Sequence, residues 1–557
     1  MNDGRLGASG AQTMLGLMQD WPLTVDRIID HAARWHGDAA VVGRAWDGSI
    51  ERSSYAQVRA NAARLSGALA RRGVRPGDRV ATLGWNTRRH LEAWYAVMGM
   101  GAVCHTLNPR LFDDQLRFII NEAADTVLFA DRAFLPFLER CRADLASLER
   151  VILLDGEAAG ADVAGLETMD ALVAETGDTV SWGGFDERTA AALCYTSGTT
   201  GNPKGVLYSH RSQFLHSLAV INADIFRLSA RDVVMPIVPM FHANAWGLPF
   251  AAPAVGAKLV MPGGRLDGLS VHELLESEGV TFAAAVPTVW QMLLQHLRET
   301  KGRLSSLERV VIGGSAVPPA MIEAFREEFG VDVIHAWGMT EMSPLGTAAR
   351  PTSLTTQLPS ADQAALATTQ GRVSVIVDMK IADDQGVELP RDGIACGRLL
   401  VRGPAVAASY LGYDKTALDE EGWFDTGDIA TIDRYGFMTV TDRAKDVVKS
   451  GGEWISSIAI ETIVMGHPAV TTCAVIGVSH PKWDERPVLV VQPTSPDAVD
   501  GDALLAFLDG KIARWWMPDH VIFLEALPLG ATGKVDKKQI RTTVEALGAG
   551  RMTGERV

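Results

Sequence analysis

Residues 195–205, YTSGTTGNPKG, carry the strongest indication of the fold in this 557-residue chain. They follow the hydrophobic run AALCY at 191–195, which is typical of a buried strand. Glycines let backbone N–H groups turn inward, and the hydroxyls and the lysine can surround anionic oxygens. The stretch is not a Walker A loop, because Pro203 separates Gly201 from Lys204. A polar linker is the alternative, but linkers seldom follow such a run, so we interpret the stretch as a phosphate-binding loop.

Strand and helix patterns alternate on both sides of this loop. Before it, helical patterns at 56–73, 90–100 and 113–124 alternate with apolar runs at 79–85, 102–107 and 126–130. After it, strands are predicted at 233–239, 257–261, 281–286, 309–314 and 331–337, with helices between them, including 287–300 and 318–329. This alternation predicts an α/β fold in which one large N-terminal domain contains two helix-covered, largely parallel sheets.

The pattern changes toward the C-terminus. Residues 350–371 are polar and show no clear period, which predicts a loop. A β-rich subdomain follows, with a turn at 383–386. The final part of the chain, about 110 residues, has the size of a small α+β domain, and its predicted boundary lies at the charged and glycine-rich stretch 442–454.

Composition excludes several classes of protein. The chain has 52 Lys and Arg against 67 Asp and Glu, a net charge of −15, which argues against a generic nucleic-acid binder. A hydrophobic share of 47% excludes disorder, collagen and coiled coil. Five scattered cysteines predict a reduced, cytoplasmic protein without disulfides. The N-terminus lacks the features of a signal peptide, and no run reaches the ~20 apolar residues of a membrane helix. We therefore expect no integral membrane segment.

Six further motifs follow the loop. They are FHANAW at 241–246, GGSAVP at 313–318, WGMTE at 337–341, WFDTGD at 423–428, DRAKD at 442–446 and GATGKV at 530–535. In this order the motifs resemble those of the adenylate-forming superfamily, which includes acyl-CoA synthetases, luciferases and peptide-synthetase adenylation domains. The resemblance implies that a carboxylate and ATP form an acyl-adenylate and pyrophosphate, after which the thiol of coenzyme A displaces AMP.

The WGMTE motif has residues suited to a nucleotide. Trp337 can stack on a purine, Thr340 can donate to a phosphate, and Glu341 can offer a hard oxygen to Mg²⁺. Taken alone, a Glu after Thr is more often the start of a helix. The resemblance adds Thr196 as a second residue near the metal. It assigns ATP or AMP binding to Thr196, Ser197, Gly198, Thr199, Thr200, Gly201, Lys204, Gly314, Ser315, Ala316, His335, Ala336, Trp337, Gly338, Met339, Asp428, Arg443 and Lys449.

His242 and Trp246 belong to the predicted acid site. A lone histidine is more often structural, but the resemblance makes His242 a wall of the carboxylate site. Trp246 is four residues later and shares its face if the stretch is helical. The resemblance implies that Trp246 lines the acyl pocket.

Lys534 is the predicted electrostatic catalyst, together with His242, Thr340 and Glu341. Attack of a carboxylate on the α-phosphorus brings two anions together, and a positioned cation offsets their repulsion. The neighbouring Lys537 and Lys538 are interpreted as a solvated basic face.

The resemblance also implies a mobile C-terminal domain. The predicted parts are a domain at 1–442 with the carboxylate and ATP sites, a hinge at 443–448 and a mobile domain at 449–557. The resemblance places Lys445 at the hinge. Motions of this kind change the backbone angles of only a few residues. Gly452 and Trp454 are assigned to coenzyme A. A homodimer is a further family-level expectation.

The choice of acid is less constrained than the reaction. The sequence resembles most the branch containing medium-chain fatty acid–CoA ligases and 3-methylmercaptopropionate–CoA ligases, although Ala459 and Thr462 depart from that branch. The segments 238–248 and 336–344 offer no cation for a second carboxylate. A short- or medium-chain monocarboxylic acid is therefore predicted, with methylmercaptopropionate as the alternative acid. An acyl-AMP ligase that does not use coenzyme A, a luciferase-like oxygenase and a non-catalytic binding protein are the competing classes.

Overall fold

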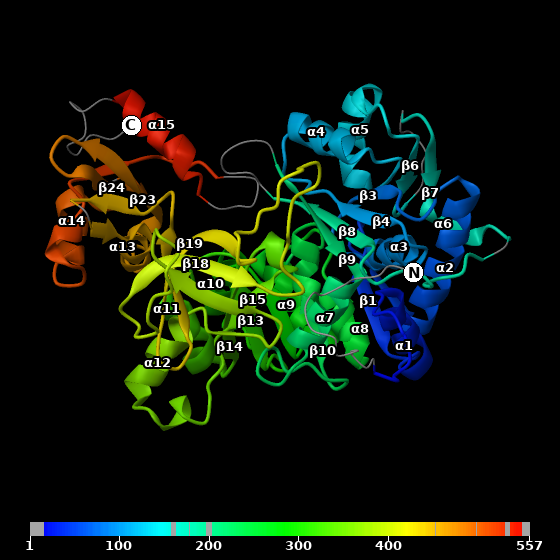
Figure 1. Cartoon of the computed structure of the whole chain (residues 1–557), viewed down its shortest axis with the longest axis horizontal. Helices are drawn as coiled ribbons and strands as arrows, with labels where there is room; N and C mark the ends of the chain where they lie inside the picture. The colour runs from blue at the N-terminus through cyan, green and yellow to red at the C-terminus, as the bar shows by residue number, and fades with distance from the viewer. Residues whose placement is uncertain are drawn as a thin grey trace, which may run out of the picture.

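The computed structural model describes residues 16–156, 163–177, 179–196, 203–451, 453–496, 498–529 and 535–547. Within these residues the chain forms four sheets, of seven, nine, four and five strands. Figure 1 shows the two large sheets with their helices on one side of the molecule and the C-terminal elements as a separate lobe at the other end.

The seven-stranded sheet has the order β7-β6-β5-β3-β4-β8-β9. Its strands are β3 (Arg79–Leu83), β4 (Val103–Thr106), β5 (Val127–Ala130), β6 (Arg150–Leu153), β7 (Leu166–Thr168), β8 (Ala190–Tyr195) and β9 (Gly205–Ser209). The sheet is parallel except for β9, which runs antiparallel to β8 and pairs Gly205 with Tyr195. The predicted phosphate loop therefore connects two neighbouring strands.

The nine-stranded sheet has the order β16-β15-β14-β13-β12-β10-β11-β1-β2. Its strands are β1 (Ala40–Arg44), β2 (Ile50–Ser54), β10 (Val233–Pro236), β11 (Lys258–Met261), β12 (Phe282–Ala285), β13 (Arg309–Gly313), β14 (Asp332–Gly338), β15 (Leu345–Ala348) and β16 (Arg372–Val373). The central strands are parallel and both edges are antiparallel. The β1–β2 hairpin lies before the region in which the sequence predicted strands.

Helices cover both large sheets, as predicted. They are α1 (Asp26–Trp35), α2 (Tyr55–Arg71), α3 (Arg88–Gly99), α4 (Asp113–Ala123), α5 (Leu135–Cys141), α6 (Met169–Ala174), α7 (His210–Val220), α8 (Leu248–Val255), α9 (Gly268–Glu278), α10 (Pro287–Thr300), α11 (Pro319–Glu323) and α12 (Ser360–Thr368). The last helix corrects the prediction that 350–371 is a loop: four alanines and a leucine support one short helix there although its surface is polar.

The main hydrophobic core lies between the two large sheets. Helix α3 is buried over almost its whole length, and Trp94 stacks on Phe250 of α8 with ring centroids 5.8 Å apart. The apolar run at 93–107 is thus buried core, as predicted. Among the described residues, no helix is both long and apolar enough to cross a membrane.

The remaining two sheets form the C-terminal part. The four-stranded antiparallel sheet contains β17 (Asp378–Ala382), β18 (Cys396–Arg402), β19 (Phe424–Ile432) and β20 (Met438–Arg443). The five-stranded sheet contains β21 (Val448–Ser450), β22 (Glu453–Ile455), β23 (Val470–His480), β24 (Asp484–Pro493) and β25 (His520–Phe523), with α13 (Ser457–Val464), α14 (Gly501–Leu508) and α15 (Lys537–Leu547). Figure 1 shows this orange and red lobe beside β18 and β19.

Short helical turns complete the described chain. They are η1 (Arg132–Phe134), η2 (Arg142–Asp144), η3 (Ala243–Gly247), η4 (Ala324–Glu328), η5 (Thr340–Met342), η6 (Thr355–Gln357) and η7 (Arg514–Trp516). Two of them, η3 and η5, carry residues of the predicted site, and both follow strands of the nine-stranded sheet.

Candidate active site

A buried carboxylate joins two motifs that are far apart in the sequence. The indole Nε1 of Trp337, on β14, donates to Asp428 Oδ2 at 3.0 Å. On the other oxygen, Arg443 Nε lies 2.8 Å from Asp428 Oδ1. The pairing of β19 with β20 places Asp428 directly opposite Arg443. The aspartate is therefore held in place on both oxygens at the end of the β-rich subdomain.

Glu341 lies in a second polar group, on η5. Its side chain is buried, and Tyr410 Oη donates to Glu341 Oε1 at 2.9 Å. Burial raises the pKa of the Glu341 carboxyl above its ordinary value. The ammonium of Lys204 lies 4.9 Å from the centroid of the Tyr410 ring, so the end of the phosphate loop approaches this carboxylate. Sequence reasoning missed Tyr410, because a single tyrosine outside the motifs carries no local signal.

A backbone hydrogen bond joins the two described ends of the predicted phosphate loop. The Thr196 N–H donates to the Lys204 carbonyl at 2.9 Å, and Tyr208 Oη donates to the Thr340 carbonyl at 2.6 Å. The first contact joins the two described ends of the predicted loop, and the second connects β9 with Thr340 of the WGMTE motif. Five predicted phosphate contacts, Ser197, Gly198, Thr199, Thr200 and Gly201, lie outside the described residues, as do Gly452 and Lys534.

The predicted adenosine contacts lie at the ends of two adjacent strands. Strands β13 and β14 are parallel, with Gly313 opposite Ala336. Three exposed residues follow β13, namely Gly314, Ser315 and Ala316, beside the segment Ala336, Trp337, Gly338 and Met339. His335 differs from these, because its Nδ1 pairs with the Thr368 carbonyl at 2.9 Å and burial lowers its pKa to about 4. The imidazole therefore contacts α12.

The backbone around Trp246 differs from the prediction. Residues 243–246 have φ between 43° and 54°, in the left-handed region, so this stretch is not an α-helix. The argument that His242 and Trp246 share a helical face is therefore wrong. Trp246 is buried instead against the end of β13: a Cβ added at Gly313 would lie 3.4 Å from Trp246 Cη2. His242 is partly exposed at the entrance to this turn.

The C-terminal lobe places the remaining predicted residues near β21. Lys449 is exposed, and its N–H donates to Glu485 Oε2 at 2.9 Å. Trp454 lies opposite Lys449 in the β21–β22 pair. Lys445 lies between β20 and β21, and burial lowers the pKa of its ammonium.

Lys537 corrects a prediction. Its side chain is not part of a solvated face but is largely buried, with Nζ 2.7 Å from Glu461 Oε1 and donating to Ser457 Oγ at 2.6 Å. Burial alone would lower the pKa of Lys537, but the carboxylates of Glu461 and Asp442 outweigh burial and raise it. Helix α15 turns this lysine toward α13, whereas Lys538 is exposed as predicted.

The donor set suits Mg²⁺ held mainly by a nucleotide. Among the described residues, no group of three or more His, Cys, Asp or Glu could hold a metal by itself. Glu341 supplies one hard carboxylate, and Mg²⁺ commonly binds through one or two carboxylates together with substrate phosphates. The residues present therefore fit the metal only in company with ATP.

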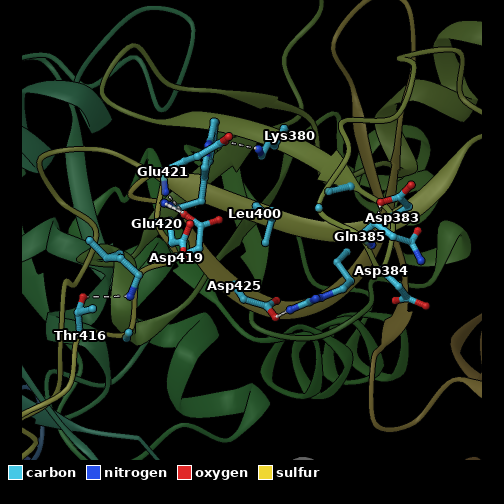
Figure 2. A pocket seen from close by; sticks show the side chains of 16 residues that line it. Lys380, Asp383, Asp384, Gln385, Leu400, Thr416, Asp419, Glu420, Glu421 and Asp425 are labelled. Carbon is cyan, nitrogen blue, oxygen red and sulfur yellow. Dashed lines mark hydrogen bonds and ion pairs between the residues drawn. The ribbon is translucent and has the colours of Figure 1, made fainter.

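A cavity of about 500 Å³ lies on the β-rich subdomain; Trp423 and Asp425 of the WFDTGD motif line it, but none of the predicted site residues does. Figure 2 shows that acidic and basic side chains around it pair with one another, with Lys380 Nζ 3.1 Å from Glu421 Oε2 and Arg398 paired with Asp425. Asp425 is exposed here, whereas Asp428 is buried against Trp337. The cavity therefore contributes nothing to the candidate site.

The fold thus brings predicted nucleotide contacts from two sheets, Trp337 on one and Asp428 on the other, into direct contact. The chain belongs to the AMP-binding enzyme family, whose model matches residues 29–411, and the model of the AMP-binding enzyme C-terminal domain matches residues 459–534. This membership confirms the predicted class, an AMP-forming acid–CoA ligase, for which ATP and coenzyme A fit as substrates.

The chain is similar over nearly its whole length to named relatives. It is 52% identical to a 3-methylmercaptopropionyl-CoA ligase of Ruegeria lacuscaerulensis, over 95% of this chain and 98% of the relative. It is 47% identical to a medium-chain-fatty-acid–CoA ligase of Ectopseudomonas oleovorans, over 95% and 97%. A crystal structure of an anthranilate CoA ligase with anthranoyl-AMP has the same fold, with a TM-score of 0.82, 24% identity and coverage of 95% and 99%.

Proposed function

We propose that this protein activates a short- or medium-chain monocarboxylic acid with ATP and transfers the acyl group to coenzyme A, releasing AMP and pyrophosphate. Two similar relatives are named for a medium-chain fatty acid and for 3-methylmercaptopropionate, and both acids are candidates. Trp246 belongs to the main buried hydrophobic cluster, which favours an uncharged tail.

The observation that carries this proposal is the hydrogen-bonded set Trp337, Asp428 and Arg443. A carboxylate fixed beside an indole can accept both hydroxyls of a ribose, while the purine lies along the exposed loop after β13. Arg443 adds a positive charge for the ribose or the α-phosphate. The three residues come from two different sheets. A nucleotide bound between these sheets can therefore contact Trp337 with its purine and Asp428 with its ribose at the same time.

We assign the metal to Glu341 and Thr196. Mg²⁺, when bound with ATP, neutralises charge on the phosphate oxygens. The chain's own part is to hold Glu341 through Tyr410 and to close the neck of the phosphate loop at Thr196. Lys204 then adds a cation on the opposite side of Tyr410.

The mobile C-terminal domain remains a prediction, with parts at 1–442, 443–448 and 449–557. Lys534 is proposed to offset the repulsion between the acid and the α-phosphate, and His242 to contact the acid. Lys445 is proposed as the hinge, and Gly452 and Trp454 as contacts of coenzyme A. A homodimer and a cytoplasmic location also remain predictions.

The test separates the two half-reactions. Lys534→Ala should lower ATP–pyrophosphate exchange by about 10² or more, because a cation aimed at developing charge is worth that much. Thioester formation from supplied acyl-adenylate should stay within about threefold of wild type. A substitution away from the reacting atoms usually changes the free energy by only about 0.5 kcal/mol.

Lys538→Ala, four residues further on and exposed, is the matched control and should leave both steps unchanged. Equal loss in both steps would contradict the assignment of Lys534. A screen of C2 to C16 acids for pyrophosphate release, with and without coenzyme A, separates a ligase from an acyl-AMP ligase.

A further inference from the structure

Three fully buried polar side chains lie on α7 and on η3, the turn that contains Trp246. Gln213 and His216 are three residues apart on α7 and so share a face, and Asn244 lies on η3. All three are 0% exposed. Helix α7 packs on η3, and a Cβ added at Gly247 would lie only 2.6 Å from His216 Nδ1.

The hydrogen bonds of His216 define its proton. Its Nε2 accepts the Leu345 N–H at 3.1 Å, and burial lowers its pKa to about 3. The ring is therefore neutral and carries its proton on Nδ1, which is a donor. Within the described chain, no acceptor pairs with this Nδ1.

The two amides add further donors. Asn244 Oδ1 accepts the Cys194 thiol at 3.2 Å, while its Nδ2 has no partner among the described residues. Neither the nitrogen nor the oxygen of the Gln213 amide has a hydrogen-bond partner within the part of the chain that the structure describes. The group thus offers unpaired N–H donors from all three side chains against one unpaired acceptor, Gln213 Oε1. An unpaired buried polar group costs about 1–3 kcal/mol, so such a group calls for a partner.

The backbone here is strained in the same place. Ala243, Asn244, Ala245 and Trp246 all have φ between 43° and 54°. Left-handed conformations cost non-glycine residues roughly 1–2 kcal/mol each, and strained residues cluster at ligand sites. The turn directs Asn244 into the interior, toward the buried end of β8.

The group lies close to His242 and Trp246, the predicted contacts of the acid. The chain passes from the partly exposed His242 to the buried Asn244 within two residues. Asn244 is bonded to Cys194, which immediately precedes the phosphate loop. Across the same turn, Gly247 lies beside His216, so the three polar side chains are close to the predicted contacts of the acid.

We propose that Gln213, His216 and Asn244 form a donor-rich wall that recognises an uncharged hydrogen-bond acceptor in the tail of the acid. The site then selects acids that carry an ether or thioether over all-carbon acids of the same length. This inference rests on the proposed acyl-CoA ligase activity. A methylene leaves the donors unpaired, whereas oxygen accepts well and sulfur accepts weakly.

The first test uses the wild-type enzyme and needs no variant. We compare kcat/KM for CoA thioester formation with 3-methoxypropionate, 3-methylthiopropionate and pentanoate, and with their homologues two carbons longer. In the length class that reaches the wall, the ether acid should exceed the all-carbon acid by about tenfold, the value of one good hydrogen bond, and the thioether acid should exceed it by less. Equal values in both length classes, or a preference for the all-carbon acids, would overturn the inference while leaving the ligase activity intact.

The second test assigns the wall to its residues. Gln213→Leu should reduce the preference to about twofold, chiefly through lower kcat/KM for the acceptor acids. Ser217→Ala is the matched control, because this buried hydroxyl of α7 already donates to the Gln213 carbonyl, and it should keep the wild-type preference. An unchanged preference in Gln213→Leu would overturn the role of Gln213, and no thioester from any acid would overturn the proposed function and this inference together.

Discussion

The buried carboxylates proposed to contact the nucleotide, Asp428 and Glu341, differ from the proposed donor-rich wall in how their polar atoms are paired. Asp428 is bonded on both oxygens, and Glu341 is held by Tyr410. Gln213, in contrast, has no pairing for either amide atom among the described residues. ATP is the same in every turnover, so its site can be completed in advance. On the proposed acid side, the unpaired donors are left for the acid to complete.

The largest effect is expected when the paired group loses its metal ligand. Glu341→Gln keeps the shape and the contact with Tyr410 but removes the negative charge. We expect adenylation to fall by about 10²–10³, the loss typical for a preorganised electrostatic group, with partial recovery at high Mg²⁺. Pyrophosphate exchange at increasing Mg²⁺ measures this.

The control for Glu341 is Glu420→Gln, an exposed carboxylate beside the cavity on the β-rich subdomain. It should leave the exchange rate and its Mg²⁺ dependence unchanged. A Glu341→Gln enzyme with wild-type exchange at low Mg²⁺ would remove Glu341 from the metal site.

A smaller effect is expected from the ribose contact. Asp428→Asn removes the charge that pairs with Arg443, and hydrogen bonds to charged groups are worth about 1.5–3 kcal/mol. The KM for ATP should therefore rise by about tenfold to a hundredfold, while the KM for the acid changes little. Asp425→Asn, three residues earlier and exposed, is the control. A selective rise in the acid KM would contradict the comparison, since it would place Asp428 on the acid side.

The smallest effect concerns the wall and pH. Burial lowers the pKa of His216 to about 3, whereas the unfolded chain takes up the proton near 6.5. The contribution of neutral His216 to stability is complete above pH 6.5 and is lost as pH falls from 6.5 toward 3. Between pH 7.5 and 5.5, wild type should lose about 1.4 kcal/mol more unfolding free energy than His216→Gln.

Denaturant unfolding at the two pH values measures this difference. Because His216 stays neutral, the preference for acceptor acids should be constant from pH 5.5 to 9. A preference that changes in step with a group titrating near 6.5 would contradict the neutral wall.

Local patterns predicted most elements and the family motifs correctly. The helix predicted at 287–300 matches α10, and the buried run predicted at 191–195 matches β8. Apolar periodicity is a local property, and a buried face is needed wherever the segment packs. Helix α12 was missed because its residues are all at least partly exposed and show no apolar period.

The contacts between polar side chains, and one backbone turn, could not be predicted from local patterns. The pairing of Lys537 with Glu461, the contact of Tyr410 with Glu341 and the left-handed turn at 243–246 had no signal in the sequence. Each joins segments that are brought together only by the register of distant strands, or by packing that outweighs backbone preference.

By itself, the amino-acid sequence determined the order of most strands and helices and the class of reaction, because these depend on residue types at short spacing. Only the tertiary structure decided which charges are buried, which are paired and which buried donors have no partner among the described residues. Burial and hydrogen bonding are set by neighbours that are distant in the sequence, such as Trp337 and Asp428, which are 91 residues apart.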